Sequence, residues 1–340
     1  MVIQATRRKS CYKPRSQASR RPSRRGQWTL LFTAALSIKP SVVASLVEPL
    51  CLSEAEASLL AAELKQQLRS GRCPPGDQVQ IEKMVAGLGD RRGLMRLTFA
   101  ESLGAVGSAA VPALCQALRN HTNVTVRRAA GKTLTLIADP SAIPDLLAAL
   151  LNDPDPVVQG SVVGAMAATG ECAVEALIGV LASSNSSAMH LGLASWGLAF
   201  VGAKAPEALR RAARSSHTEV RTAAIAALGE QIQALGDEEA RGLVLEALGD
   251  SAELVRAEAS TLLGKLHDPI WAAPHLKPLL ADSSVQVRKN TALSLMKLRA
   301  VEAIPALESA LRVETSDEVR PILQLSIRQI RQHHLEVDED

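Results

Sequence analysis

Acidic and basic side chains recur at a fixed spacing along this 340-residue sequence. A basic or polar residue, which we call the anchor, recurs at Arg96, Arg127, Gln159, His190, Arg221, Arg256, Arg288 and Arg320. Six residues before four of the anchors lies an acid, which gives the pairs Asp90–Arg96, Asp250–Arg256, Asp282–Arg288 and Glu314–Arg320. Such groups could transfer protons or form ion pairs that fix turns. A catalytic site is needed once, whereas this pattern repeats. We therefore predict a structural ladder, in which each carboxylate fixes a turn and meets an Arg of its own or the next repeat.

The acid–Arg pattern fails in the four middle units, which have His121/Arg127, Asp153/Gln159, Ser184/His190 and Ser215/Arg221. The helix expected near His190 also carries Met189, Trp196, Gly197 and Phe200. A broken local rule often marks a functional site, although Trp196 could instead fill the core opposite Gly197. Arg and aromatic side chains are common interface anchors. We predict a binding surface in the concave groove of the solenoid, which the second helices line. It contains Arg127, Arg128, Gln159, His190, Trp196 and Arg221.

Other chemistry has no support in the sequence. The seven His residues show no HExxH spacing, no glycine-rich phosphate loop is present, and the five Cys form no CxxC pair. We expect no catalytic residue and no metal site. We expect the thiols to be reduced and mostly buried.

The spacing of the anchors predicts the elements that position them. Successive anchors are 31, 32, 31, 31, 35, 32 and 32 residues apart, and a fixed period of this length is typical of stacked helical repeats. Fifteen residues before the anchor a Pro recurs, at Pro112, Pro144, Pro206 and Pro305, where it suits the first turn of a helix. Apolar residues three, four and seven positions after the anchor give a second helix one apolar stripe. The longer gap before Arg256 predicts a longer loop around residues 231–239.

The sequence therefore predicts an all-α fold, a right-handed α-solenoid of about eight HEAT-like helix pairs. Residues 79–335 form this solenoid, and residues 336–340 are an acidic tail. Residues 46–78 hold a first helix and a stiff turn, because Ser53 and Glu56 make a capping box. Residues 1–45 form a basic arm that we expect to be disordered.

The charge of the chain is unevenly distributed. Ten of the 38 Lys and Arg precede the first acid, Glu48, so the remainder carries 28 basic and 35 acidic residues, a net charge of −7. An export signal, a transit peptide and a disordered arm all remain interpretations of the basic segment. The apolar run from Trp28 to Ile38 is too short to cross a bilayer. We expect no transmembrane span, no nucleic-acid partner and a cytoplasmic location.

Two stretches match the HEAT pattern closely: Ala142-Ile143-Pro144-Asp145-Leu146-Leu147 followed by Asp153-Pro154-Asp155-Pro156-Val157-Val158, and Ala303-Ile304-Pro305-Ala306-Leu307 followed by Asp317-Glu318-Val319-Arg320. They resemble the HEAT-like repeats of the cyanobacterial phycobilin lyase family. The segment from Met84-Val85-Ala86-Gly87 to Ala138-Asp139-Pro140 looks like the members of bilin biosynthesis type. The resemblance covers about residues 53–335.

The resemblance implies a binding or chaperone-like protein of phycobilisome biogenesis, with a linear tetrapyrrole of phycocyanobilin type as its ligand. The implied partner is a phycobiliprotein subunit or a second HEAT-repeat lyase subunit. Members of the family assist thioether attachment of a bilin to a cysteine of the antenna protein. A protein–protein scaffold for another assembly pathway, such as iron–sulfur cluster assembly, is the alternative.

Overall fold

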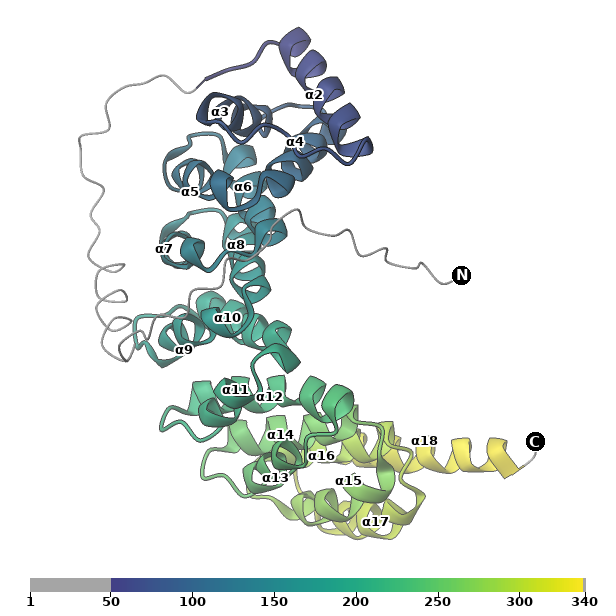
Figure 1. The fold of residues 1–340 in the computed structure, drawn as a ribbon. Coiled ribbons are helices and arrows are strands. Elements are labelled where there is room, and N and C mark those ends of the chain that lie inside the picture. Colours follow the sequence, from purple (N-terminus) through teal and green to yellow (C-terminus); the bar gives the residue numbers. More distant parts are fainter. Residues whose placement is uncertain (1–49, 339–340) are drawn as a thin grey trace. The chain divides into compact units, whose positions relative to one another are not determined.

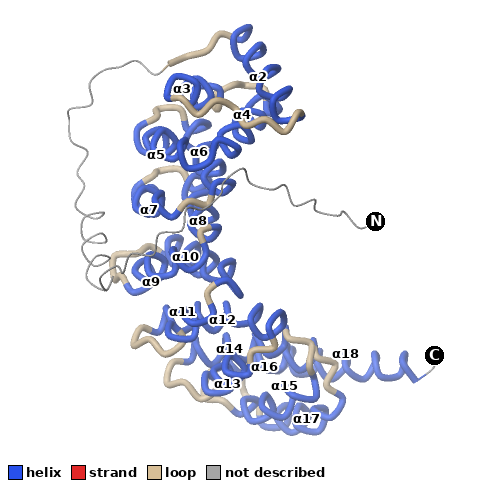
Figure 2. The backbone as a smooth tube through the Cα atoms, in the orientation of Figure 1, coloured by secondary structure: helices blue, strands red, loops and turns tan. Residues whose placement is uncertain are grey.

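A computed structural model of the chain describes residues 50–338 (Figure 1). The predicted basic arm, residues 1–45, lies outside the described residues. The described part is built of α-helices and short 3-10 turns and contains no strand (Figure 2). Eight helix pairs follow one another between residues 78 and 338, as predicted, and one further helix precedes them.

The chain divides into two compact units, at residues 165 and 166. The first unit contains α2 (Glu54–Arg69), α3 (Gln78–Gly87), α4 (Gly93–Val106), α5 (Val111–Asn120), α6 (Val124–Ile137), α7 (Ile143–Asn152) and most of α8 (Pro156–Ala168). The second unit continues with α9 (Val174–Ala182), α10 (Ala188–Val201), α11 (Pro206–Ala212), α12 (Thr218–Leu235), α13 (Glu238–Ala247), α14 (Glu253–Lys265), α15 (Pro269–Leu276), α16 (Val285–Lys297), α17 (Ile304–Val313) and α18 (Arg320–Asp338).

Within each unit the second helices of successive pairs pack on one another. In the second unit α10 packs on α12, α12 on α14, α14 on α16 and α16 on α18. In the first unit α2 packs on α4 and α4 on α6, so α2 occupies the place of a second helix that lacks a first. The stacked helices bury the Ala- and Leu-rich stripes that no single pair could bury.

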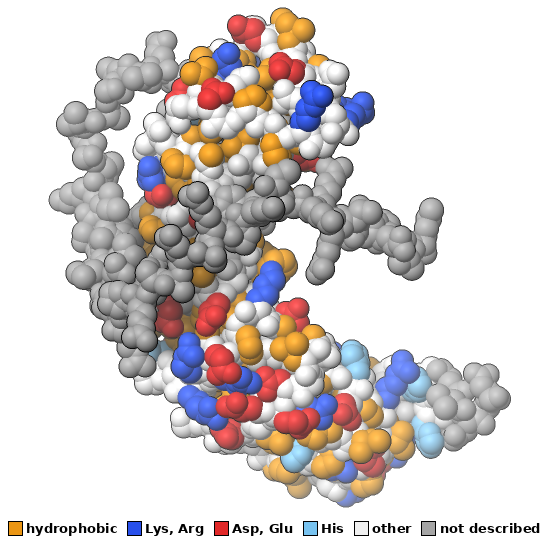
Figure 3. All heavy atoms as spheres, in the orientation of Figure 1, with side chains coloured by type: hydrophobic (Ala, Val, Ile, Leu, Met, Phe, Trp, Pro, Cys, Tyr) orange, Lys and Arg blue, Asp and Glu red, His pale blue; other side chains and the backbone are white. Residues whose placement is uncertain are grey.

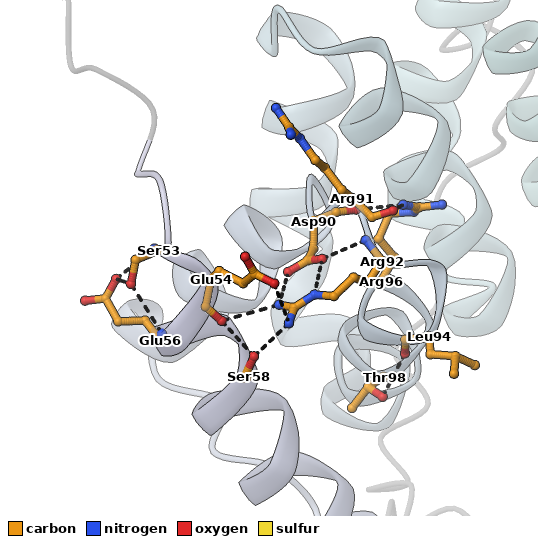
Figure 4. A network of polar contacts seen from close by, with 10 residues as sticks. All are labelled: Ser53, Glu54, Glu56, Ser58, Asp90, Arg91, Arg92, Leu94, Arg96 and Thr98. Atoms are coloured by element: carbon orange, nitrogen blue, oxygen red, sulfur yellow. Dashed lines mark hydrogen bonds and ion pairs between the residues drawn. The ribbon is translucent and has the colours of Figure 1, made fainter.

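Local sequence signals account for the helix starts. Proline occupies the first turn of α5, α7, α11 and α17, as the spacing predicts. Ser53 and Glu56 form the predicted capping box at α2: the Ser53 side chain accepts from the Glu56 N–H, and Glu56 accepts from the Ser53 N–H at 2.8 Å. Arg92 then ties this helix to the next pair, donating to the Ser58 hydroxyl at 2.8 Å (Figure 4).

Small residues let the helices approach closely. A Cβ added at Gly87 would lie 2.5 Å from the ring of Phe99, which is fully buried between α3 and α4. The contact requires glycine at this position because the ring occupies the place of a side chain.

The connection between α12 and α13 differs from the prediction. The prediction of a longer loop around residues 231–239 is wrong: the extra residues lengthen α12, which continues to Leu235, and only Gly236 and Asp237 separate it from α13.

One described stretch, Gly93–Asn120, is long and apolar enough to cross a membrane by length and composition. Gly107, with φ 76° and ψ −140°, interrupts it, so it folds as α4, a 3-10 turn and α5.

Candidate functional site

Four anchors hold an acid of the following repeat. Arg256 donates from Nε and Nη2 to the two carboxylate oxygens of Asp282, at 2.8 and 2.9 Å. We call such a bidentate ion pair a rung. The other rungs among the described residues are Arg127–Asp153, Arg221–Asp250 and Arg288–Glu314. All eight of these side chains are largely buried, and paired hydrogen bonds of this kind are strong and geometrically specific.

Each of these four arginines also closes the turn of its own repeat. Nη1 of Arg288 donates to the backbone carbonyls of Asp282 and Ser283, at 2.9 and 3.2 Å. The carboxylate of Asp282 accepts the Ser284 N–H at 2.7 Å and meets Arg256 of the preceding repeat. The predicted ladder exists, but the sequence analysis gave it the wrong direction: a carboxylate meets the Arg of the preceding repeat, and the six-residue spacing reflects a side chain-to-backbone contact.

The first and last acid–Arg pairs of the predicted ladder differ from the rungs. The Asp90 carboxylate pairs with Arg92 at 2.7 Å, and Arg96 donates only to the backbone of Asp90 and Arg91 (Figure 4). Arg320 donates to the Glu314 and Leu311 carbonyls. Neither Arg96 nor Arg320 forms a rung within residues 50–338.

The ion pairs lower the pKa of the carboxyl groups. Arg256 and Arg221 hold the pKa of Asp282 and of Asp250 below the ordinary Asp value, because hydrogen bonds from the guanidinium favour the charged form. Arg288 lowers the pKa of Glu314 to about 2. These acids are charged at neutral pH and serve as structural ties.

The arginines of the predicted binding surface take part in such pairs. Arg127 and Arg221 belong to rungs, and Arg128 pairs with Asp155 at 2.5 Å. The statement that the ladder fails at Arg127 and Arg221 is therefore wrong. Acidic and basic side chains are interspersed on the visible face of the second unit (Figure 3). A ligand would have to compete with these pairs, and a binding role for the three arginines stays a prediction.

The ladder is interrupted at α10. In α4, α6, α12, α14 and α16 the anchor is the fourth residue after the N-cap, as in Arg221 after His217 and Arg256 after Ala252. The N-cap of α10 is Ser187, whose side chain accepts the His190 N–H at 3.2 Å. The anchor position of α10 is therefore held by Leu191, and His190 lies one residue before it. With Leu191 as the anchor, the seventh position after it is the buried Leu198 and not Gly197.

The surface of α10 is aromatic where the ladder is interrupted. Trp196 and Phe200 are 48% and 54% exposed, and their rings stack with centroids 5.6 Å apart and an angle of 29° between planes. The Nζ of Lys204 lies 5.8 Å from the centroid of Phe200. Met189, also exposed, is on the same helix two residues before Leu191. Trp196 is therefore part of a surface and does not fill the core.

The neighbouring helix α12, which packs on α10, carries small side chains near its start. Residues one and five positions after its anchor are Thr222 and Ala226, both small and partly exposed. The ninth is Glu230, whose carboxylate accepts the Ala203 N–H at 3.2 Å. A Cβ on Gly202 would lie 1.6 Å from that carboxylate, so Glu230 occupies the space beside the turn that carries Lys204. We call Met189, Trp196, Phe200, Lys204 and Glu230 the α10 surface.

The sequence analysis missed Lys204 and Glu230 and did not include Phe200 in the site. The spacing of 196, 200 and 204 is a signal that could have found two of them, since residues four apart lie on one helix face. Glu230 gave no signal, because its contact with Gly202 and Ala203 depends on packing between two helices.

Some buried polar atoms lack a hydrogen-bond partner. Among the described residues, Nδ1 of His190, Oε1 of Gln159 and both amide atoms of the fully buried Gln231 lack hydrogen bonds. The Gln159 amide still closes its own turn by donating to the Asp153 carbonyl at 2.9 Å. Unpaired polar atoms of this kind destabilise the fold.

The cysteines and possible metal ligands are dispersed. Cys51, Cys73 and Cys172 are exposed and Cys115 is buried, so the expectation of mostly buried thiols is wrong for the described cysteines. Burial raises the pKa of the Cys115 thiol to about 12. Within residues 50–338 no group of three or more His, Cys, Asp or Glu is placed to hold a metal ion.

Comparison with known proteins agrees with the stacked helix pairs. The family model of HEAT repeats matches residues 81–167, 111–189, 205–293 and 241–328. The chain belongs to the HEAT-repeat family. Within that class it is 46% identical over 282 residues to Bilin biosynthesis protein MpeU of Synechococcus sp. (strain WH8020), which covers 83% of this chain and 95% of the relative. The resemblance to HEAT-like proteins of bilin biosynthesis type is thereby confirmed.

A second relative and two solved structures are also similar. Uncharacterized phycocyanin operon protein Z of Pseudanabaena tenuis (strain PCC 7409) is 33% identical over 124 residues, covering 34% of this chain and 61% of the relative. A multiple mutant of Kap121p shares the fold, with a TM-score of 0.51, 11% identity, and coverage of 89% of this chain and 37% of that chain. The complex of CpcE and CpcF of phycocyanin lyase from Nostoc sp. PCC7120 aligns with a TM-score of 0.31 at 19% identity, covering 76% of this chain and 97% of that chain.

Proposed function

We propose that this protein acts in the maturation of phycobiliproteins, by holding a linear tetrapyrrole of the phycocyanobilin type on the α10 surface while a phycobiliprotein subunit receives it. The observation that carries the proposal is the stacked, exposed pair of Trp196 and Phe200 at the point where the ladder is interrupted. The similarity to Bilin biosynthesis protein MpeU supplies the chemical class of the ligand. The cytosol of a cyanobacterium, or a plastid stroma, is the compartment that fits this role.

The α10 surface suits an extended conjugated molecule with acidic side chains. Aromatic rings stack favourably on conjugated rings, and the exposed rings of Trp196 and Phe200 already lie in a stacked arrangement. The ammonium of Lys204 is placed to meet a propionate. Glu230 acts as a positioning residue, because its hydrogen bond to Ala203 fixes the turn that carries Lys204.

The role we propose is positioning. None of the residues of the α10 surface is an activated nucleophile, and the thiol that receives a bilin belongs to the partner. Holding two reactants in a fixed orientation lowers the entropic part of the barrier and can suppress attachment in a wrong orientation. Gln159, His190 and the paired arginines Arg127, Arg128 and Arg221 are further candidates for contact with the phycobiliprotein.

The test is a titration of the full-length protein with phycocyanobilin, followed by visible absorption. We expect a shifted band that saturates, and a dissociation constant at least about tenfold higher for Trp196→Ala and Phe200→Ala, since one stacking contact contributes about 1.4 kcal/mol or more. Leu254→Ala is the matched control, because Leu254 is an equally exposed apolar residue on α14.

Addition of apo-phycocyanin then tests whether the bilin is transferred. Absence of a shifted band would contradict the proposal. Equal losses in the control would show that the α10 surface is not the site. Binding of apo-phycocyanin without any effect of bilin would favour a protein–protein scaffold.

A further inference from the structure

The last anchor of the ladder has an open guanidinium edge. Arg320 uses Nη1 to close its own turn, donating to the Glu314 carbonyl at 2.7 Å, as every other anchor arginine does. In the four rungs Nε and Nη2 hold a carboxylate of the following repeat. Among residues 50–334, whose side chains the structure describes, no carboxylate forms an ion pair with Arg320. The α17–α18 pair therefore presents an unfilled carboxylate site.

A hollow of about 370 Å³ lies on the same pair of helices. Its apolar floor is Leu311 and Ile327, and its polar rim is Glu308, Gln324, Arg328 and Arg331. Arg331 pairs with Glu308, whereas Arg328 is exposed. The hollow is thus apolar within and positively charged at its edge, and the carbonyl of Leu311 accepts from Arg320.

Val313 adds exposed apolar surface next to this pair. It is 78% exposed and directly precedes Glu314. The residues before the other acids of the ladder are Gly89, Asn152, Gly249 and Ala281, all small or polar.

The first helix, α2, carries features that are complementary to this surface. Leu59 is 74% exposed in the middle of α2, with the exposed acids Glu56 and Glu63 one turn to either side. Asp90 occupies the position at which a rung acid pairs with an arginine of the preceding repeat. Its carboxylate pairs instead with Arg92 (Figure 4). Glu56 accepts hydrogen bonds from Ser53 and Glu63 accepts one from Gln67, but neither carboxylate forms an ion pair among the described residues.

We propose that copies of this chain associate head to tail, with the exposed face of α2 of one copy seated on the α17–α18 pair of another. Leu59 enters the hollow above Leu311 and Ile327, and Glu63 and Glu56 face Arg328 and the open edge of Arg320. Because α2 and α18 are both second helices, this contact continues the packing seen inside each unit.

An antiparallel pair of α18 helices from two copies is disfavoured. Arg328 and Arg331 are both exposed and lie one turn apart, so antiparallel pairing would bring like charges together. The proposed contact joins two different surfaces, so it can link successive copies into a ring or an open chain as concentration rises. This inference goes beyond the proposed function and does not depend on it.

The test is the weight-average mass of the full-length protein, measured by sedimentation as a function of protein concentration. We expect the mass to rise with concentration in low salt and to fall towards that of the monomer as salt is added, since screening weakens exposed charge pairs. Arg328→Glu and Glu63→Lys should each abolish the rise. A mixture of these two variants should restore it, because each altered charge then meets its opposite.

Leu59→Ser should also keep the protein monomeric, whereas Leu254→Ser is the matched control and should leave the association unchanged. Circular dichroism of every variant shows whether the helices remain. A mass independent of concentration would overturn the proposal. So would association that survives both charge reversals, or that the control reduces as much as Leu59→Ser.

Discussion

Arg256 binds Asp282, 26 residues further along the chain, through two parallel hydrogen bonds of 2.8 and 2.9 Å. The same guanidinium donates to the Asp250 carbonyl of its own turn at 2.9 Å. One side chain therefore closes a turn and joins two repeats. Arginine suits this task because its planar fork presents several donors in a fixed geometry, which lysine lacks.

Removal of one rung should lower stability. We expect Asp282→Ala to reduce the free energy of unfolding by about 1–3 kcal/mol, because Arg256 and the Ser284 N–H lose a charged partner. Urea unfolding measures the change. Asp317→Ala, at an exposed acid in the last turn before α18, is the control and should change stability by less than about 0.5 kcal/mol. A double-mutant cycle with Arg256→Ala should show a clear coupling energy, and additive losses would argue against the rung.

Stability should depend on pH through Glu314. Its pKa in the folded protein is about 2 because Arg288 stabilises the charged form, whereas an unfolded chain has a Glu pKa of about 4.3. A lowered folded-state pKa contributes stability above the unfolded value, and this contribution is lost as pH falls from about 4.3 towards about 2. The free energy of unfolding, measured with urea, should differ less between about pH 5 and about pH 3 for Arg288→Gln than for the wild type. Arg312→Gln, at an exposed arginine of α17, should leave the difference unchanged.

A new rung should form where α10 lacks one. Leu191 holds the anchor position and Ser215 the position of the acid in the next repeat. The change in the free energy of unfolding caused by the double variant Leu191→Arg/Ser215→Asp should exceed the summed changes of the two single variants by about 1 kcal/mol, in the stabilising direction. Thermal and urea unfolding of the four proteins give this coupling. The pair His190→Arg/Ser215→Asp should show none, and coupling there instead would mean that His190 holds the anchor position.

Two glycines should respond to alanine in opposite ways. At Gly87 the new methyl group would lie 2.5 Å from the Phe99 ring, so we expect a loss of about 1–3 kcal/mol from overpacking. Gly242 lies within α13 with open space around it, and Gly242→Ala should stabilise by about 0.5–1 kcal/mol because alanine favours the helix. Chemical unfolding of both variants checks the pair. Equal effects would contradict the close approach of α3 and α4.

The repeat itself could be predicted because it is a property of spacing. Eight anchors, the recurring prolines and the capping box of Ser53 and Glu56 are all local in sequence, and the helix pairs follow them. The register of α10 could not be predicted from the anchors, because Leu191 resembles neither Arg nor Gln. His190, one position away, was the nearest polar residue. Only the N-cap at Ser187 reveals the shift.

The candidate site was predictable in part. Trp196 stood out because aromatic residues are few, but its exposure and its stacking on Phe200 depend on which face of α10 the core covers. The direction of the ladder was missed for a similar reason. A six-residue spacing inside one repeat is visible in the sequence, whereas the contact of Arg127 with Asp153 joins two repeats and depends on how they stack.

The rungs have a consequence for the way such a chain can change in evolution. Rungs such as Arg127–Asp153, Arg221–Asp250 and Arg288–Glu314 join residues 26 to 29 positions apart, so each spans only one repeat boundary. Loss of a whole helix pair between two rungs, such as α13–α14, would leave Arg221 with Asp282 at the position that Asp250 now occupies. A change of a few residues within a pair displaces one rung and spares the others. Homologous chains should therefore differ in length mainly by whole repeats, and their gene boundaries should preserve the distance from each arginine to the next acid.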